Sequence, residues 1–224
     1  MKYYLAPMEG LTTYNFRTNW NRCYGGMDKY FTPFISNRHM NSRERNDVLP
    51  EHNVGMYTVP QILTNKAEEF LSLAEQLAGY GYHEVNLNLG CPSGTVVARN
   101  RGAGFLGTPR ELENFLDEIF EKCPLEISIK TRIGMDYMDE WAPLLKIYQK
   151  FPIKELIIHP RLQKEGYKGT PHLEAFAEAV EALQCPLCYN GDITSPESLT
   201  QILTKLPSID TVSYTHLRAH ETEA

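Results

Sequence analysis

The segment Asn88-Leu89-Gly90-Cys91-Pro92 places a thiol in a turn that directly follows the strand-like run Glu84–Leu87. A lone cysteine more often fills space in a core. Here the glycine and proline restrict the turn, the asparagine adds a polar group, and the nearby stretch Arg101-Gly102-Ala103-Gly104 is too basic and glycine-rich for a packed interior. Barrels and open sheets build active sites at the carboxyl ends of strands. The pattern therefore predicts a chemically active thiol at Cys91.

Polar residues also recur at the ends of the other predicted strands. Any one of them would be read as an ordinary surface residue, but their recurrence at one end of successive strands predicts a shared site. The residues, in chain order, are Pro7, Met8 and Glu9 after the first strand, Gln61 after the third, Lys130 and Arg132 after the fifth, His159 after the sixth, and Asn190, Gly191 and Asp192 after the seventh.

These side chains must be positioned by alternating strands and helices. The pattern predicts strands at residues 3–6, 29–34, 57–63, 84–89, 126–131, 155–159, 187–190 and 209–212, and helices at 13–23, 66–80, 109–122, 139–150, 173–183 and 196–205. Repeated strand–helix units imply parallel strands with right-handed crossovers. Eight strands favour an α/β fold of the (β/α)8 TIM-barrel type over an open sheet.

Three local features complete the prediction. Residues 38–53 are interpreted as a long functional loop. Thr108-Pro109 and Ser195-Pro196 are predicted to start helices, each with an N-cap hydroxyl before a proline at the first helical position. Residues 1–212 are taken as the barrel domain, and 213–224 as an atypical tail that is not native to it, so the barrel is expected to be incomplete at its last unit.

Composition narrows the class of protein. The 224 residues are 42% hydrophobic and 22% charged, which is typical of a soluble globular domain. Five cysteines without framework spacing suit the cytoplasm, and Cys185-Pro186-Leu187-Cys188 is interpreted as structural because no second pair completes a zinc site. Neither a signal peptide nor an apolar run of about 18 residues is present, so no membrane span is expected. No metal is expected either.

The net charge of −6 argues against a nucleic-acid partner, but the charge is unevenly spread. Acidic residues concentrate in the predicted helices, which leaves room for one basic face formed by loops. Basic residues crowd two such loops, Arg38, His39, Arg43 and Arg45 in the first, and Arg99, Arg101 and Arg110 in the second.

The ordered set of motifs resembles the tRNA-dihydrouridine synthases, which are FMN-dependent barrel enzymes. The resemblance runs from the first residues to about Val212, and it rests on the combination of motifs more than on any one. The segments that carry it are Ala6-Pro7-Met8-Glu9-Gly10, Asn88-Leu89-Gly90-Cys91-Pro92, Gly102-Ala103-Gly104, Lys130-Thr131-Arg132, His159-Pro160-Arg161 with Gly166-Tyr167, and Asn190-Gly191-Asp192. Family members continue with a Gly-Arg phosphate-binding segment and a helical domain that helps to hold tRNA. This sequence has neither.

The resemblance implies FMN across the barrel mouth. Lys130 would place positive charge near the reduced ring, and Gln61 would bind the polar edge of the ring. The remaining implied contacts are Pro7, Met8 and Glu9 along the ring, His159 near the flavin and its phosphate, and Asn190, Gly191 and Asp192 at the ribityl and phosphate end.

The same resemblance makes Cys91 the general acid. Reduction of a uracil 5,6 double bond needs a hydride at C6, here from reduced FMN with NADPH as reductant, and a proton at C5, which the thiol would give. Asn88 would orient the uracil, Lys130 and Arg132 would contact the base or its phosphate, and Arg38, Arg99 and Arg101 would contact the phosphates of tRNA. The base must leave its stack to react.

Two alternatives stay open at this stage. One is an FMN barrel acting on a free pyrimidine, such as a dihydroorotate or dihydropyrimidine dehydrogenase. The other is an inactive fragment whose missing last unit leaves strand edges unpaired, which predicts weak or absent FMN retention by these 224 residues. The preferred hypothesis is a cytoplasmic, monomeric, FMN- and NADPH-dependent reductase of tRNA uridines.

Overall fold

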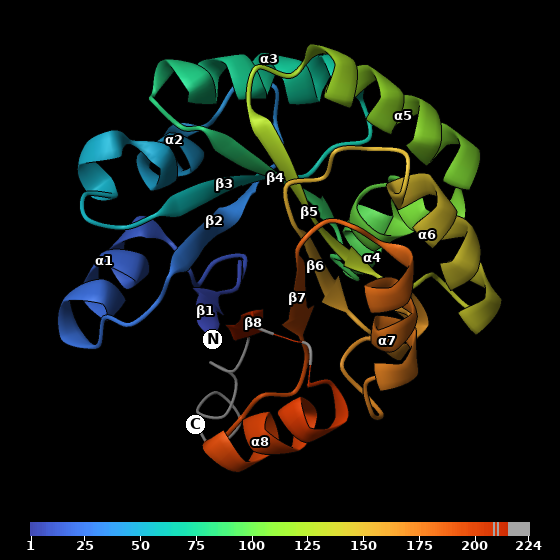
Figure 1. Ribbon diagram of the computed structural model, residues 1–224. Helices are drawn as coiled ribbons and strands as arrows, with labels where there is room; N and C mark the ends of the chain where they lie inside the picture. Colours follow the sequence, from blue (N-terminus) through green and yellow to red (C-terminus); the bar gives the residue numbers. More distant parts are fainter. Residues whose placement is uncertain (208, 210, 215–224) are drawn as a thin grey trace.

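Eight parallel strands close into a barrel in the computed structural model of the chain, which describes residues 1–207, 209 and 211–214 (Figure 1). Each strand pairs with the next one along the chain, and the eighth pairs with the first. The predicted TIM-type barrel is confirmed. The strands are β1 Lys2–Leu5, β2 Lys29–Ile35, β3 Thr58–Ile62, β4 Glu84–Leu89, β5 Glu126–Arg132, β6 Leu156–His159, β7 Leu187–Asn190 and β8 Thr211–Tyr214.

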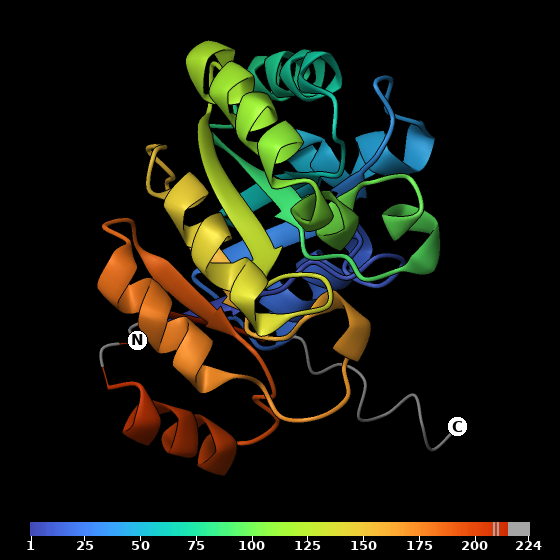
Figure 2. The ribbon, with the colours of Figure 1, turned by 90° about the vertical axis from the view of Figure 1, so that its right-hand side faces the viewer.

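Helices surround this barrel, and α5 to α8 follow one another along its outside in the side view of Figure 2. Their apolar faces cover the outer surface of the strands. In α3, for example, Phe70, Leu73, Ala74 and Leu77 are buried at three- and four-residue spacing. The α-helices are α1 Tyr14–Cys23, α2 Ser42–Val48, α3 Ala67–Gly79, α4 Gly94–Val97, α5 Pro109–Lys122, α6 Trp141–Tyr148, α7 Leu173–Ala182 and α8 Pro196–Lys205, and the 3-10 helices are η1 Pro50–His52, η2 Gly102–Gly107, η3 Met138–Glu140 and η4 Gln163–Glu165.

The interpretation of residues 38–53 as a loop was wrong, because this stretch contains α2 and η1. A capping box starts α2: the Asn41 side chain accepts from the Glu44 backbone N–H, and the Glu44 carboxylate accepts from the Asn41 N–H, both at 2.9 Å. The seven residues of α2 include one buried apolar side chain, Val48. A helix this short shows no apolar periodicity, so only the capping-box residues Asn41 and Glu44 could have indicated it from the sequence.

The two predicted helix caps differ. The Ser195 side chain accepts a hydrogen bond of 3.2 Å from the Ser198 N–H, as predicted for an N-cap. Thr108 precedes α5 with Pro109 as its first residue, as predicted, but its hydroxyl does not cap the helix, since it donates to the Phe105 carbonyl at 3.3 Å and accepts from Asn100 at 3.1 Å. A competing turn before α5 therefore takes the Thr108 hydroxyl away from the helix.

The expected unpaired strand edges are not present, because β8 forms parallel pairs with both β7 and β1. Asn190 is paired in register with Ser213, and Leu5 with Tyr214. The strand predicted to end at 212 therefore continues for two residues, since Ser213 pairs with both neighbouring strands and Tyr214 pairs with β1. The remainder of the predicted tail, 215–224, lies outside the described residues.

A buried ion cluster occupies the barrel at the amino ends of its strands. Lys29 Nζ lies 3.0 Å from a carboxylate oxygen of Glu84 and 2.9 Å from one of Glu155. The hydroxyls of Tyr57 and Tyr4 donate to the same two carboxylates at 2.9 and 2.8 Å. The lysine thus holds two carboxylates inside the barrel that burial would otherwise disfavour strongly.

Replacing Lys29 by methionine is expected to lower the free energy of unfolding by roughly 3–5 kcal/mol, because both carboxylates would stay buried without their cation. Urea unfolding measures this. Lys154→Met is the matched control, since the exposed Lys154 also pairs with a glutamate, Glu126, and should cost about 0–1 kcal/mol. Equal losses in the two variants would contradict the structural role of the Lys29 cluster.

Candidate active site

A cavity of about 690 Å³ opens at the carboxyl ends of the strands. This volume lies within the roughly 300–1,000 Å³ of small-molecule and cofactor sites. The cavity also includes Phe34, Tyr167 and Thr194, to which no role was assigned from the sequence. The predicted site residues in its wall are Pro7, Met8, Glu9, Gln61, Asn88, Cys91, Lys130, Arg132, His159, Asn190 and Asp192.

The turn that carries Cys91 is held from three sides. The Asn88 side-chain oxygen accepts from the backbone N–H groups of Gly90 and Cys91, at 3.1 and 2.9 Å. Arg132 Nε donates to the Gly90 carbonyl at 3.0 Å, and the Ala103 N–H donates to the Cys91 carbonyl at 3.1 Å. Arg132 and Asn88, predicted as substrate contacts, thus also position the thiol.

Burial raises the pKa of the Cys91 thiol, and it outweighs a backbone hydrogen bond from Ser93 and the nearby charge of Lys130. The thiol therefore keeps its proton to a higher pH than an ordinary cysteine. A half-buried thiol that faces a cavity in this state is suited to give a proton to a ligand. It is a poor nucleophile at neutral pH, because the thiolate is the nucleophilic form.

A ladder of amides joins three strands beneath this turn. Asn88 Nδ2 donates to the side-chain oxygen of Gln61, and Gln61 Nε2 donates to that of Asn86, both at 2.8 Å. Asn86 donates to the Ser128 hydroxyl at 2.9 Å. Gln61 therefore supports Asn88 besides lining the cavity. Asn86 was missed from the sequence, although it shares the inward face of β4 with Asn88 by strand alternation.

Lys130 extends from β5 into the cavity without a hydrogen-bond or ion-pair partner among the described residues. Burial, with a smaller contribution from the charge of Arg132, lowers the pKa of Lys130 to about 8. The ammonium group is therefore still mostly charged at neutral pH. A half-buried charge without a partner is costly, so the site favours a ligand that brings acceptor atoms or negative charge to Lys130.

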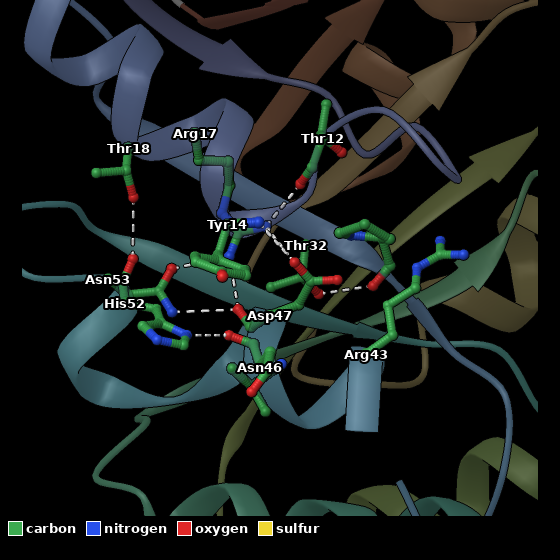
Figure 3. Close-up of polar contacts among 12 residues, drawn as sticks. Thr12, Tyr14, Arg17, Thr18, Thr32, Arg43, Asn46, Asp47, His52 and Asn53 are labelled. Atoms are coloured by element: carbon green, nitrogen blue, oxygen red, sulfur yellow. Dashed lines mark hydrogen bonds and ion pairs between the residues drawn. The ribbon is translucent and has the colours of Figure 1, made fainter. Parts of the chain in front are cut away.

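The loop that carries Pro7, Met8 and Glu9 rests on a buried arginine, shown in Figure 3. The Thr12 hydroxyl accepts from the Met8 N–H at 2.9 Å, and Arg17 donates to the Thr12 carbonyl at 2.6 Å. Arg17 also donates to the Asp47 carbonyl at 2.6 Å and to Asn53 at 2.9 Å. The overlooked helix α2 thus supports one wall of the cavity through Asp47.

Arg38, Arg99 and Arg101 lie outside the cavity wall. Arg38 forms an exposed ion pair of 2.6 Å with Glu68, and Arg99 is exposed. Arg101 pairs with Glu69 at 3.2 Å and donates to the Ser36 carbonyl, so it links three segments of the fold. Their role as phosphate contacts stays a prediction.

Gly191 is also absent from the cavity wall. A Cβ atom built there would lie 2.2 Å from the Tyr189 hydroxyl. Packing against the Tyr189 ring therefore explains the glycine, and the contact with the ribityl and phosphate end of FMN that the resemblance implied for it stays a prediction.

Within the described part of the chain, His, Cys, Asp and Glu residues nowhere form a group of three or more that could hold a metal. In the same residues, no helix combines the length and the apolar character needed to cross a membrane.

The profile of the family described as dihydrouridine synthase (Dus) matches residues 4–212. The chain belongs to the dihydrouridine synthase family. It is 26% identical over 202 residues to tRNA-dihydrouridine synthase B of Pasteurella multocida, covering 89% of this chain and 60% of that protein. A probable tRNA-dihydrouridine synthase of Staphylococcus epidermidis is 30% identical over 218 residues, covering 90% and 64%. The chain thus spans less than two thirds of these curated relatives.

Solved structures resemble this dihydrouridine synthase family member in fold. A variant of NCR from Zymomonas mobilis superimposes with a TM-score of 0.63 at 12% identity, covering 95% of this chain and 81% of that one. Morphinone reductase has the same TM-score and the same coverage at 11% identity. At such low identity the likeness supports the barrel fold alone.

Proposed function

We propose that this chain forms the FMN-binding catalytic barrel of an enzyme that reduces the 5,6 double bond of specific tRNA uridines. The single observation that carries the proposal is the juxtaposition, in one cavity, of a protonated Cys91 thiol and an unpartnered Lys130. Membership in the dihydrouridine synthase family supports the choice of uracil as the reacting group. NADPH is proposed as the reductant.

The cavity residues fit a flavin. Lys130 needs an acceptor. Asn190 Nδ2 donates to the Ser213 carbonyl at 2.8 Å, whereas its buried side-chain oxygen accepts no hydrogen bond from the described residues. FMN offers a partner to each side chain, because its ring carries carbonyl oxygens that can accept from Lys130 and its ribityl chain carries hydroxyls that can donate to Asn190. FMN, when bound, would supply the hydride for C6 of the uracil.

Cys91 would give the proton that C5 of the uracil needs. The thiol loses its proton to carbon in this step and regains one from solvent, so that one hydride and one proton are added to the double bond. Asn88 and Arg132 hold the backbone of the turn, which limits movement of the sulfur. The target base would have to leave the tRNA stack to enter the cavity, with Arg38, Arg99 and Arg101 proposed near the phosphates.

Gly102→Ala is expected to slow dihydrouridine formation by on the order of 10²-fold through a displacement of Cys91 by about 1 Å. Gly102 has φ +57, and an added Cβ would lie 2.9 Å from the Cys91 carbonyl oxygen and 3.0 Å from its Cβ. Gly55→Ala is the control, because Gly55 has a similar φ of +74 but no atom within 4 Å of the added Cβ. Rates of the full-length enzyme on unmodified tRNA measure the difference. If the two variants were equally active, contact with Cys91 would not matter.

The proposed function is tested by the dihydrouridine content of tRNA from cells with and without the intact gene. We expect dihydrouridine to disappear from particular tRNA positions when the gene is deleted and to return with the complete gene on a plasmid. Unchanged dihydrouridine levels would refute the proposal. A purified enzyme that turned over free uracil without any tRNA would instead support a free-pyrimidine reductase.

A further inference from the structure

We propose that Arg161 is a positioning residue that locks His159 as the neutral tautomer with its proton on Nδ1. His159 then serves the cavity as a hydrogen-bond donor and not as a source of protons. The tautomer itself is independent of which ligand enters the cavity. Its meaning for catalysis rests on the function proposed above, because it leaves Cys91 as the proton donor.

The contact between the two side chains determines the tautomer. Arg161 Nη1 lies 3.2 Å from His159 Nε2, and both side chains are buried. A guanidinium group can only donate hydrogen bonds, so Nε2 must accept and cannot carry a proton. The remaining ring nitrogen, Nδ1, therefore carries the proton of the neutral ring.

Arg161 cannot easily turn away, because all five of its N–H donors are engaged. Its two terminal nitrogens bind the Asp192 carboxylate at 2.7 and 2.6 Å, and Nε donates to the Lys168 carbonyl at 3.1 Å. The last two N–H groups point to His159 Nε2 and to the Gly169 carbonyl. A rotation that freed His159 would leave buried donors without partners. Asp192 thus acts on the cavity through Arg161.

The charges around His159 favour the same neutral form. Lys130 and Arg132 approach from β5 and Arg161 follows β6, while Asp192, which follows β7, is already bound by Arg161. Burial and these three cations lower the pKa of His159 well below its usual value. The Tyr167 ring packs 5.8 Å from the imidazole and adds no charge.

Nδ1 of His159 has no hydrogen-bond partner among the described residues, and His159 lines the cavity. A neutral Nδ1–H group is a hydrogen-bond donor but a very weak acid. Together with Lys130 it makes this wall of the cavity donate to its ligand. The wall therefore selects a ligand edge that carries oxygen or unprotonated nitrogen atoms, and His159 does not compete with Cys91 in proton transfer.

The tautomer is read from two-bond proton–nitrogen correlations of the full-length protein labelled with ¹⁵N-histidine. The signals of His159 are assigned by their loss in His159→Gln. We expect Nε2 to show the chemical shift of an acceptor nitrogen and Nδ1 that of a protonated one, with no change as the pH falls through about 6.5, where an ordinary histidine titrates. An Nε2–H pattern, or a ring that becomes doubly protonated near that pH, would overturn the proposal.

Two variants separate position from charge. Arg161→Met should populate the Nε2–H form and raise the pKa of His159, because one cation is removed and Asp192 is released. Arg161→Lys retains the positive charge, but a single ammonium group cannot bridge Asp192 and His159 as the guanidinium group does. The Nε2–H form should therefore also appear, while the pKa of His159 stays low. Arg22→Met, on the exposed face of α1, is the control and should leave the His159 signals unchanged.

An unchanged tautomer in Arg161→Lys would remove the positioning role even if Arg161→Met failed to fold. The spectra need no tRNA and no turnover. If the enzyme proved inactive on tRNA, the assignment of the His159 tautomer would therefore still stand. If the tautomer proved to be the other one, the proposed reduction of tRNA uridines would still stand.

Discussion

Cys91→Ala is expected to lower the rate of dihydrouridine formation by ~10²–10⁴-fold, the usual contribution of a positioned general acid. The thiol is half-buried in the cavity, its turn is held by Asn88 and Arg132, and burial keeps it protonated at neutral pH. Alanine removes the proton donor without adding bulk or charge. FMN binding and flavin reduction by NADPH should therefore remain, while transfer to the uracil should fail.

Single-turnover assays on unmodified tRNA separate these steps, because flavin absorbance reports binding and reduction and nucleoside analysis reports the product. Cys123→Ala is the control, since this cysteine follows α5 and lies outside the cavity wall. Cys123→Ala should leave both the flavin absorbance and the amount of dihydrouridine formed unchanged. Full tRNA activity in Cys91→Ala would show that the proton comes from another donor or from water.

Lys130→Met is expected to lower the rate by ~10²–10³-fold, which is the typical loss when one buried stabilising donor is removed. Lys130 is a cavity cation without a partner among the described residues, so its charge is free to act on the ligand. FMN retention should also weaken, because methionine fills the space but offers neither a hydrogen bond nor a charge. Lys122→Met, on the exposed surface of α5, should change neither activity nor FMN retention.

The same lysine predicts a pH dependence with a definite sign. The pKa of Lys130 is lowered to about 8, so its positive charge is present below this pH and is lost as the pH rises through it. Binding of FMN to the apoprotein, in which Lys130 has no ligand beside it, should therefore weaken above about pH 8, and this gives the pH profile of FMN affinity an alkaline limb. Lys130→Met should lack this limb of the profile. A limb that persisted in the variant would have to be assigned to another group.

Regular elements could be predicted from the sequence because each carries its own pattern. Four elements, β4, β7, α5 and α8, begin and end at the predicted residues. Long stripes of apolar residues and short runs bounded by turns are local signals. α2 was missed for the corresponding reason, since its seven residues contain one buried apolar side chain and its partners lie in distant segments.

The site could be predicted only in outline. Strand ends gather at one face of a parallel barrel, so Cys91, Lys130 and His159 were expected to share a cavity. The sequence could not show that Arg17 and Asp47 support the loop at Met8, because these contacts join residues up to 30 positions apart. Nor could it show that β8 closes the barrel, which depends on backbone pairing with β1 at the opposite end of the chain.

The sequence by itself determined the alternation of strands and helices, the thiol at a strand end and the resemblance to a flavin-dependent family, because residue type and spacing are local properties. Only the tertiary structure decided the protonation of the site. The pKa values of Cys91 and Lys130 depend chiefly on burial. The tautomer of His159 depends on the orientation of the Arg161 guanidinium group. These quantities arise when distant residues are packed together and water is excluded, and no single segment of the chain contains them.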